Sequence, residues 1–198
     1  MITKPIFQFP LTEYLVTLGG GTCSPTLIFI GALMAKVLPV KGIKQKHENS
    51  CWAACIRMVL AYDNLIVTND DTLASKCGVD ANKCQDASKM MGICKIYDST
   101  DDEALVPTLK EIKAEIDKGR PIIQCVNESR VAPGGSSSGG HYILIVGYDM
   151  DTNKIAVIDP ADGNLQYPTY QNEKIYLIAY KKDMYYAQPY YTKKGKPF

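Results

Sequence analysis

Histidine is scarce in this chain of 198 residues, which contains two, and tryptophan occurs once. Histidine is the side chain whose ordinary pKa lies near neutral pH, so only His47 and His141 are candidates for imidazole chemistry. Long hydrophobic runs are also missing. The apolar stretch 27–35 is far shorter than the roughly 20 residues that span a bilayer. We therefore predict no stable membrane insertion, and the interrupted N-terminus does not resemble a secretory signal peptide.

An excess of charge of either sign is absent as well. The chain has 22 Lys and Arg against 21 Asp and Glu, a net charge of +1. Such a balance gives no general attraction to nucleic acids or membranes, so no nucleic-acid partner is predicted. The sequence shows no internal repeat and no glycine-rich phosphate-binding motif.

Zinc-type cysteine spacing is missing too, although cysteine itself is frequent, at seven residues. Cys77, Cys84 and Cys94 lie in a polar segment without a C-x-x-C pattern. We predict no metal site and no cofactor. Two of these thiols could form a disulfide in an oxidising compartment, whereas a reactive thiol elsewhere in the chain favours a reducing place of action.

What the sequence does contain is a cysteine at the start of an apolar helix. Asn49 and Ser50 are good N-cap residues, and the run 52–62 lacks Gly and Pro. Cys51 then lies in the first turn, where unpaired backbone N–H groups and the helix dipole favour an anion. These conditions make a thiolate nucleophile available near neutral pH. Cys55 and Cys125 are interpreted instead as small core residues.

A strand downstream begins with the second histidine. Gly139 and Gly140 precede His141, and the buried strand 142–146 follows. The glycines, together with Trp52, are predicted to line the substrate site, because glycine lets a substrate backbone approach closely. His47 lies between charged residues and is interpreted as a solvated loop residue.

A carboxylate is expected beside this histidine. The strand 154–158 should pair with 142–146 through a turn at 149–153, which brings Asp159 to the sheet end near His141. Asp159 could then fix the imidazole tautomer. It could instead cap the turn after Pro160, in which case Asp162 or Asp149 would orient the ring. Gln45, upstream of Cys51, is a candidate oxyanion donor together with the backbone N–H of Cys51.

These segments together resemble the papain-like cysteine proteases. The resemblance rests on the Gln45 to Cys51 spacing, the pair Cys51-Trp52, the segment 140–148 and the segment 157–160, in that order along residues 43 to 180. Two bacterial branches look closest: secreted effector proteases and the double-glycine peptidase domains that trim bacteriocin leaders. The resemblance implies Cys51 as nucleophile, His141 as base and acid, Asp159 as orienting residue and Gln45 as oxyanion donor.

Two departures point to compact bacterial forms of that group. His141 follows Cys51 by 90 positions, against the roughly 130 to 150 of plant and lysosomal members. An aspartate also stands where those enzymes carry asparagine. The implied fold is α+β, with a helical subdomain that carries the nucleophile helix packed against a small antiparallel sheet. The domains expected are an N-terminal extension at 1–40, the protease domain at 41–183 and a basic Tyr/Lys-rich tail at 184–198.

The predicted function is that of a cysteine endopeptidase that cleaves a protein substrate, at a Gly-Gly site as the first hypothesis. By analogy we expect a secreted bacterial toxin or effector that is delivered into a target-cell cytoplasm and has a cognate immunity or inhibitor protein. Two alternatives stay open. The same residues could deamidate or transamidate a glutamine, because that reaction also passes through a thioester, and the fold could serve as a silent binding module.

Other segments carry smaller predictions. Gly20-Gly21, preceded by Leu15 and Leu18, resembles a double-glycine cleavage site, although a flexible linker explains it as well. A helix is predicted over 108–118, a short helix capped by Asp70 or Asp71, and strands over 121–126 and 175–180. The Ser/Gly-rich stretch 127–140 is expected to be a loop that gates the substrate or is inert.

Overall fold

The fold combines four helices with an antiparallel sheet in the part of the chain that the computed structural model describes, residues 34–100, 106–127, 140–172 and 189–196. The helices are α1 (Cys51–Tyr62), α2 (Asp70–Cys77), α3 (Ala87–Ile93) and α4 (Leu109–Asp117). The strands are β1 (Ala35–Val37), β2 (Tyr97–Thr100), β3 (Ile122–Asn127), β4 (Gly140–Asp149), β5 (Lys154–Asp159), β6 (Asn164–Gln166) and β7 (Pro189–Thr192). None of the helices described has the length and apolar character that a bilayer crossing requires.

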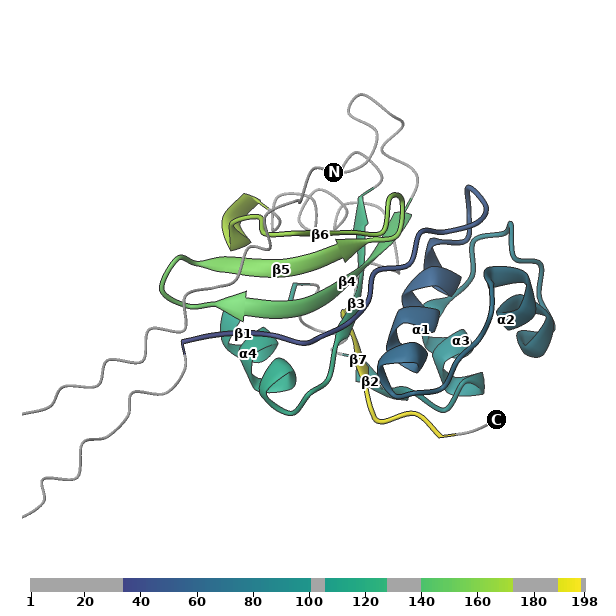
Figure 1. Cartoon of the computed structure of the whole chain (residues 1–198), viewed down its shortest axis with the longest axis horizontal. Coiled ribbons are helices and arrows are strands. Elements are labelled where there is room, and N and C mark those ends of the chain that lie inside the picture. The colour runs from purple at the N-terminus through teal and green to yellow at the C-terminus, as the bar shows by residue number, and fades with distance from the viewer. Residues whose placement is uncertain (1–33, 101–105, 128–139, 173–188, 197–198) are drawn as a thin grey trace, which may run out of the picture. The chain divides into compact units, whose positions relative to one another are not determined.

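The sheet has the strand order β2-β7-β3-β4-β5-β6, and β1 pairs with β4 beside this path. Every pairing is antiparallel. Figure 1 shows α1, α2 and α3 gathered together at one side and α4 against the sheet. The predicted α+β class, with the Cys51 helix packed on an antiparallel sheet, is confirmed.

Alternating side chains of β4 supply two separate cores. Tyr142, Leu144 and Val146 join the core that contains α1, whereas Ile143 and Ile145 join the core that contains α4. This is the period of two expected of a strand that is covered on both faces. Burying each large apolar side chain contributes roughly 1.5 to 3 kcal/mol, so the two cores fix the path of β4 firmly.

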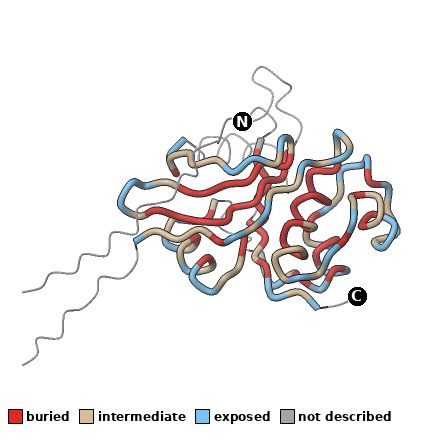
Figure 2. The backbone as a smooth tube through the Cα atoms, viewed as in Figure 1, coloured by how far each residue is buried: buried red, intermediate tan, exposed pale blue. Residues whose placement is uncertain are grey.

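Helix α1 is buried almost all round. Its residues 51–56 and 58–60 are buried, and Figure 2 shows the helix largely in red. The reason is its position, because it contacts β4 on one side and α2 on another. Arg57 is the exception within this run, and its role is described below.

The helix termini follow local chemistry with one difference. Helix α4 begins with a capping box in which the Thr108 and Glu111 side chains bond each other's backbone N–H groups, as the predicted helix over 108–118 requires. Helix α2 is capped by Asn69, not by Asp70 or Asp71 as predicted. The side chain of Asp70 is therefore available for a different contact.

The C-terminal segment corrects the predicted domain limits. Residues 189–192, expected to belong to a basic tail, form strand β7 between β2 and β3. Tyr190 is buried there, and its ring lies against Tyr142 with centroids 6.1 Å apart. Strand β1 likewise falls inside the predicted extension at 1–40 and pairs with β4. Both segments have apolar side chains and extend the sheet by pairing with strands far away in the sequence. Local charge patterns do not reveal such pairing.

Three predictions lie outside the described residues. They are the double-glycine pair at 20–21, the substrate-gating loop apart from its two end residues, and the strand at 175–180.

Candidate active site

His141 and Asp159 form a buried pair at the end of the β4–β5 hairpin. Leu144 pairs with Ile158, so the same register places Asp159 opposite Ile143, two residues from His141 and on the same face. The His141 Nε2 atom lies 2.7 Å from Asp159 Oδ1. The two residues are 6% and 3% exposed, respectively. The hairpin and the neighbourhood predicted from the sequence are confirmed.

The two alternative carboxylates are committed elsewhere. Asp149 accepts hydrogen bonds from the backbone N–H groups of Asp151 and Thr152 and from the Thr152 hydroxyl, so it closes the β4–β5 turn. Asp162 is exposed and accepts the N–H of residue 164. Asp159 also accepts the Ala161 N–H at 2.9 Å, so it caps its own turn and holds the imidazole at once.

Both Asp159 and Cys51 raise the pKa of His141. Burial disfavours the charged imidazolium, but the interactions with Asp159 and Cys51 outweigh it and raise the pKa of His141 to about 9. Since Nε2 faces Asp159, Nδ1 is the ring nitrogen left for the thiol. The fold therefore brings together a thiol, an imidazole and a carboxylate that lie in three separate sequence segments.

Cys51 is the first residue of α1, as predicted, and is 6% exposed. The local capping differs from the prediction, because the Ser50 side chain makes no cap hydrogen bond to the helix. Trp52 is also corrected as a substrate-binding residue. Its side chain is fully buried and its indole N–H donates to the Lys83 carbonyl at 3.1 Å, so it anchors the helix start from within the core.

Gln45 lies on the loop before α1, but its amide group is engaged. The Nε2 atom donates to the carbonyls of His47 and Glu48, at 2.9 and 2.7 Å, and Oε1 is buried with no hydrogen-bond partner among the described residues. Its assignment as oxyanion donor stays a prediction, which requires the amide to turn when substrate binds. His47, expected to be solvated, is half-buried and lies 2.5 Å from an Asp71 carboxylate oxygen.

A close backbone contact ties this loop to the Asp159 turn. The Gln45 N–H donates to the Pro160 carbonyl at 2.7 Å. A Cβ atom on Gly42 would lie 2.0 Å from the Gly163 carbonyl oxygen, and Gly163 has a φ of +75°. Glycine is required at both positions, because a side chain at either would separate the two segments.

Two further residues, Asp70 and Arg57, were not predicted to belong to the site. They form a buried ion pair of 2.6 Å behind the loop that carries Gln45 and Cys51. Asp70 has the sequence pattern of an ordinary acidic residue in the first turn of a helix, and Arg57 that of a polar residue on an amphipathic one. No local signal distinguishes them from solvated charges.

The other buried cysteines of the described chain are unlike Cys51 in setting. Cys55 is fully buried and Cys125 is 2% exposed, which confirms them as core residues. Burial raises the pKa of Cys55 well above its usual value, so it is a poor nucleophile. Cys77 and Cys94 have their sulfur atoms 3.9 Å apart as thiols, and burial raises the pKa of Cys94 to about 12.

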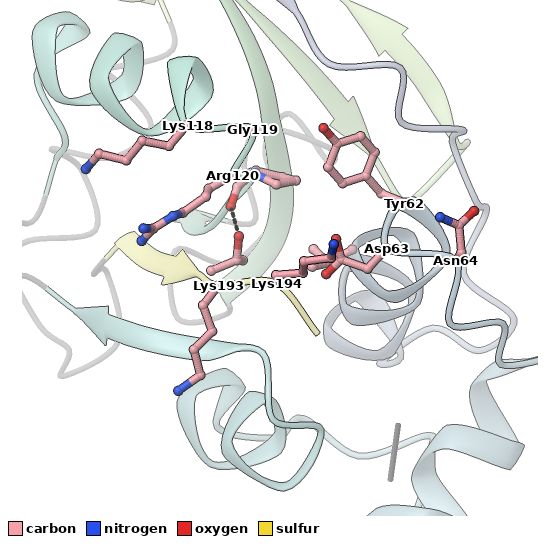
Figure 3. A pocket seen from close by; sticks show the side chains of 11 residues that line it. Tyr62, Asp63, Asn64, Lys118, Gly119, Arg120, Lys193 and Lys194 are labelled. Carbon is pink, nitrogen blue, oxygen red and sulfur yellow. Dashed lines mark hydrogen bonds between the residues drawn. The ribbon is translucent and has the colours of Figure 1, made fainter. Parts of the chain in front are cut away.

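A cavity of about 440 Å³ lies away from these residues, at the other end of α1. Figure 3 shows the cationic ends of Lys118, Arg120 and Lys193 extending away from Asp63. Two of them are paired, Lys118 with Glu115 and Arg120 with Asp98. The cavity therefore brings no catalytic group together, and we place the chemistry at the start of α1.

Comparison with known proteins agrees with this arrangement of thiol, imidazole and carboxylate, which is that of a cysteine hydrolase. A model of the peptidase C39-like family matches residues 37–188, and the chain belongs to this family. It is a cysteine peptidase of the papain-like group. No curated protein matches the chain.

One similar solved structure is a double glycine motif protease from an AMS/PCAT transporter, in complex with the leader peptide. Its sequence is 16% identical, the match covers 79% of this chain and 93% of that one, and the TM-score is 0.45.

Proposed function

We propose that Cys51, His141 and Asp159 hydrolyse a peptide bond, with Gln45 and the Cys51 backbone N–H as oxyanion donors. The observation that carries the proposal is the buried His141 ring, whose Nε2 atom lies 2.7 Å from Asp159 Oδ1 and whose pKa is raised by both Asp159 and Cys51. A raised pKa keeps His141 protonated near neutral pH, which suits a thiolate–imidazolium pair.

The reaction begins with attack of the Cys51 sulfur on the carbonyl carbon of the substrate. The carbonyl electrons move to oxygen, and the resulting oxyanion requires donors that are worth roughly 3 to 4 kcal/mol. His141 then protonates the leaving amine as the C–N bond breaks, which leaves a thioester on Cys51. A water molecule gives its proton to His141 and attacks the thioester carbon. The C–S bond then breaks, which restores the Cys51 thiolate and releases the acid product. Asp159 holds the ring through both steps.

The substrate proposed is a protein cleaved after a Gly-Gly pair. Cys51 and His141 are each only 6% exposed, so a substrate must reach a sulfur with little exposed surface. Residues without side chains suit such a site best, because their backbone can approach closely. Gly140 of the predicted substrate site is half-buried at the start of β4, while Gly139 lies outside the described residues.

A matched set of peptides tests this specificity. We expect the wild-type protein to cleave a peptide after Gly-Gly and the same peptide with Ala-Ala at least about 10-fold more slowly, since each extra methyl must enter a tight site. Cys51→Ala protein is the control and should cleave neither. Equal cleavage of both peptides by the wild-type protein would reject the Gly-Gly preference, and cleavage by the variant would reject Cys51 as nucleophile.

We also propose that the protein acts as an effector in the cytoplasm of a target cell, where a reducing environment keeps Cys51 a thiol. A cognate inhibitor protein is part of this proposal. Comparison of new protein N-termini in cells that express active or Cys51→Ala protein tests it. Identical N-termini in the two cell populations would reject a cellular target.

A further inference from the structure

The loop between the two proposed oxyanion donors is held by one buried carboxylate. Asp70 is fully buried, and its Oδ2 atom accepts the Lys46 backbone N–H at 2.7 Å and the Ser50 hydroxyl at 2.6 Å. Lys46 directly follows Gln45, and Ser50 directly precedes Cys51. The carboxylate thus binds both ends of the loop. We call Asp70, Arg57 and Ser50 the clamp.

Arg57 neutralises this carboxylate and fixes it to helix α1. Its Nη1 atom lies 2.6 Å from Asp70 Oδ1, while Nε and Nη2 donate to the carbonyls of Val67 and Thr68 at 3.0 and 2.8 Å. Arg57 belongs to the same rigid helix as Cys51. The loop is therefore held in a fixed position relative to the helix that carries the nucleophile.

The Ser50 hydroxyl bonds Asp70 in place of the usual helix-capping hydrogen bond. A serine before a helix usually caps it and so stabilises it. Here the hydroxyl donates to Asp70 and accepts the His47 N–H at 3.0 Å instead, and the residue has φ −98° and ψ 19°. A buried ion pair is also weak support for stability as such, because its desolvation offsets much of its attraction. These features favour a positional role over a stabilising one.

We infer that Asp70, with Arg57 and Ser50, positions the oxyanion site by fixing the separation between Gln45 and the backbone N–H of Cys51. This inference rests on the proposed roles of Cys51 and Gln45. None of the three residues needs to touch substrate. A displacement of about 1 Å at such a site can cost about 100-fold in rate, so small changes in the clamp should be visible.

Two small reagents separate this role from a general effect on the thiol. p-Nitrophenyl acetate acylates a thiolate through a tetrahedral oxyanion: the S–C bond forms, and the C–O bond to p-nitrophenolate then breaks. Iodoacetamide alkylates the same sulfur by direct displacement of iodide, with no oxyanion. The ratio of the two rates at Cys51 reports the oxyanion site and needs no knowledge of the natural substrate. The Cys51→Ala variant supplies the background from the other cysteines.

The variants are Asp70→Asn and the milder Ser50→Ala, with Thr192→Val as a matched control. Thr192 is also buried and also loses one hydroxyl bond, to the Pro121 carbonyl at 2.7 Å, but lies in the remote cavity wall. We expect acylation to fall about 10-fold in Ser50→Ala and about 100-fold in Asp70→Asn. Alkylation should stay within about 2-fold of wild type in both, and the control should change neither rate.

The outcomes are distinct. Equal losses of acylation and alkylation, or no loss in Ser50→Ala, would overturn the positioning role. If Asp70→Asn fails to fold, the Ser50→Ala ratio decides. A wild-type burst no larger than that of Cys51→Ala would instead refute the proposed function itself.

Discussion

The two halves of the site are built by different means. His141 and Asp159 lie on a single hairpin, where a short-range register and two apolar cores fix their geometry. Gln45 and Cys51 lie on a loop and a helix start, where an ion pair between α1 and α2 fixes theirs. The first half is local and apolar in origin, whereas the second depends on polar contacts between distant segments. The folding stability of the second should therefore respond more sharply to single polar substitutions.

The largest loss of activity is expected when His141 is removed. His141→Ala should lower peptide turnover by about 10⁴-fold or more, because the leaving amine and the attacking water lose their proton carrier. The midpoint of thermal unfolding, measured beside activity, should change much less than turnover. Retained activity would show that His47 or water supplies the proton.

The half of the site that contains Gln45 and Cys51 should lose more unfolding free energy on substitution than the hairpin half. Arg57→Met leaves the Asp70 carboxylate buried without its partner, which should cost about 3 to 5 kcal/mol of unfolding free energy. Urea denaturation measures this. A matched change on the exposed pair Lys118–Glu115, Lys118→Met, should cost no more than about 1 kcal/mol. Similar losses in the two variants would contradict a buried, structurally important pair.

Asp159→Asn tests the hairpin half with little change of shape. Turnover should fall by about 100-fold. The loss should be smaller than in a serine triad, because an imidazolium that carries both protons can still donate to the asparagine oxygen. The negative charge that raises the pKa of His141 is lost, so the alkaline limb of the pH–rate profile should move to lower pH. An unmoved limb would mean that Asp159 does not act on His141.

The smallest effect is expected at the backbone contact between the Gln45 loop and the Asp159 turn, which joins the two halves. In Gly42→Ala a methyl group would meet the Gly163 carbonyl, and relief of this clash should cost about 1 to 3 kcal/mol. Turnover should fall along with stability, because the Gln45 loop moves away from the Asp159 turn. Gly92→Ala, where a Cβ meets nothing within 4 Å, is the control. A Gly42→Ala protein that matches this control would show that the two segments need not touch.

The difference between the halves also explains what the sequence could predict. The start of a helix, a strand, a turn and the register of a hairpin are each encoded in a short stretch of sequence. The Cys51 helix and the proximity of His141 to Asp159 could therefore be predicted from local sequence patterns. Asp70 and Arg57 could not be found, since their partner choice depends on how α2 packs against α1. The same holds for Trp52, which turned out to be core, and for β7, whose strand pairing joins segments far apart in the chain.

The most direct test of the account is the titration of His141, followed by NMR of its imidazole. Only two histidines exist, so a His47→Gln protein assigns the signal. The account predicts a pKa of about 9 in the wild-type protein, and a lower value in Cys51→Ala because one hydrogen bond and one negative charge are removed. A midpoint near the ordinary value of about 6.5, unchanged by loss of the Cys51 thiol, would contradict it.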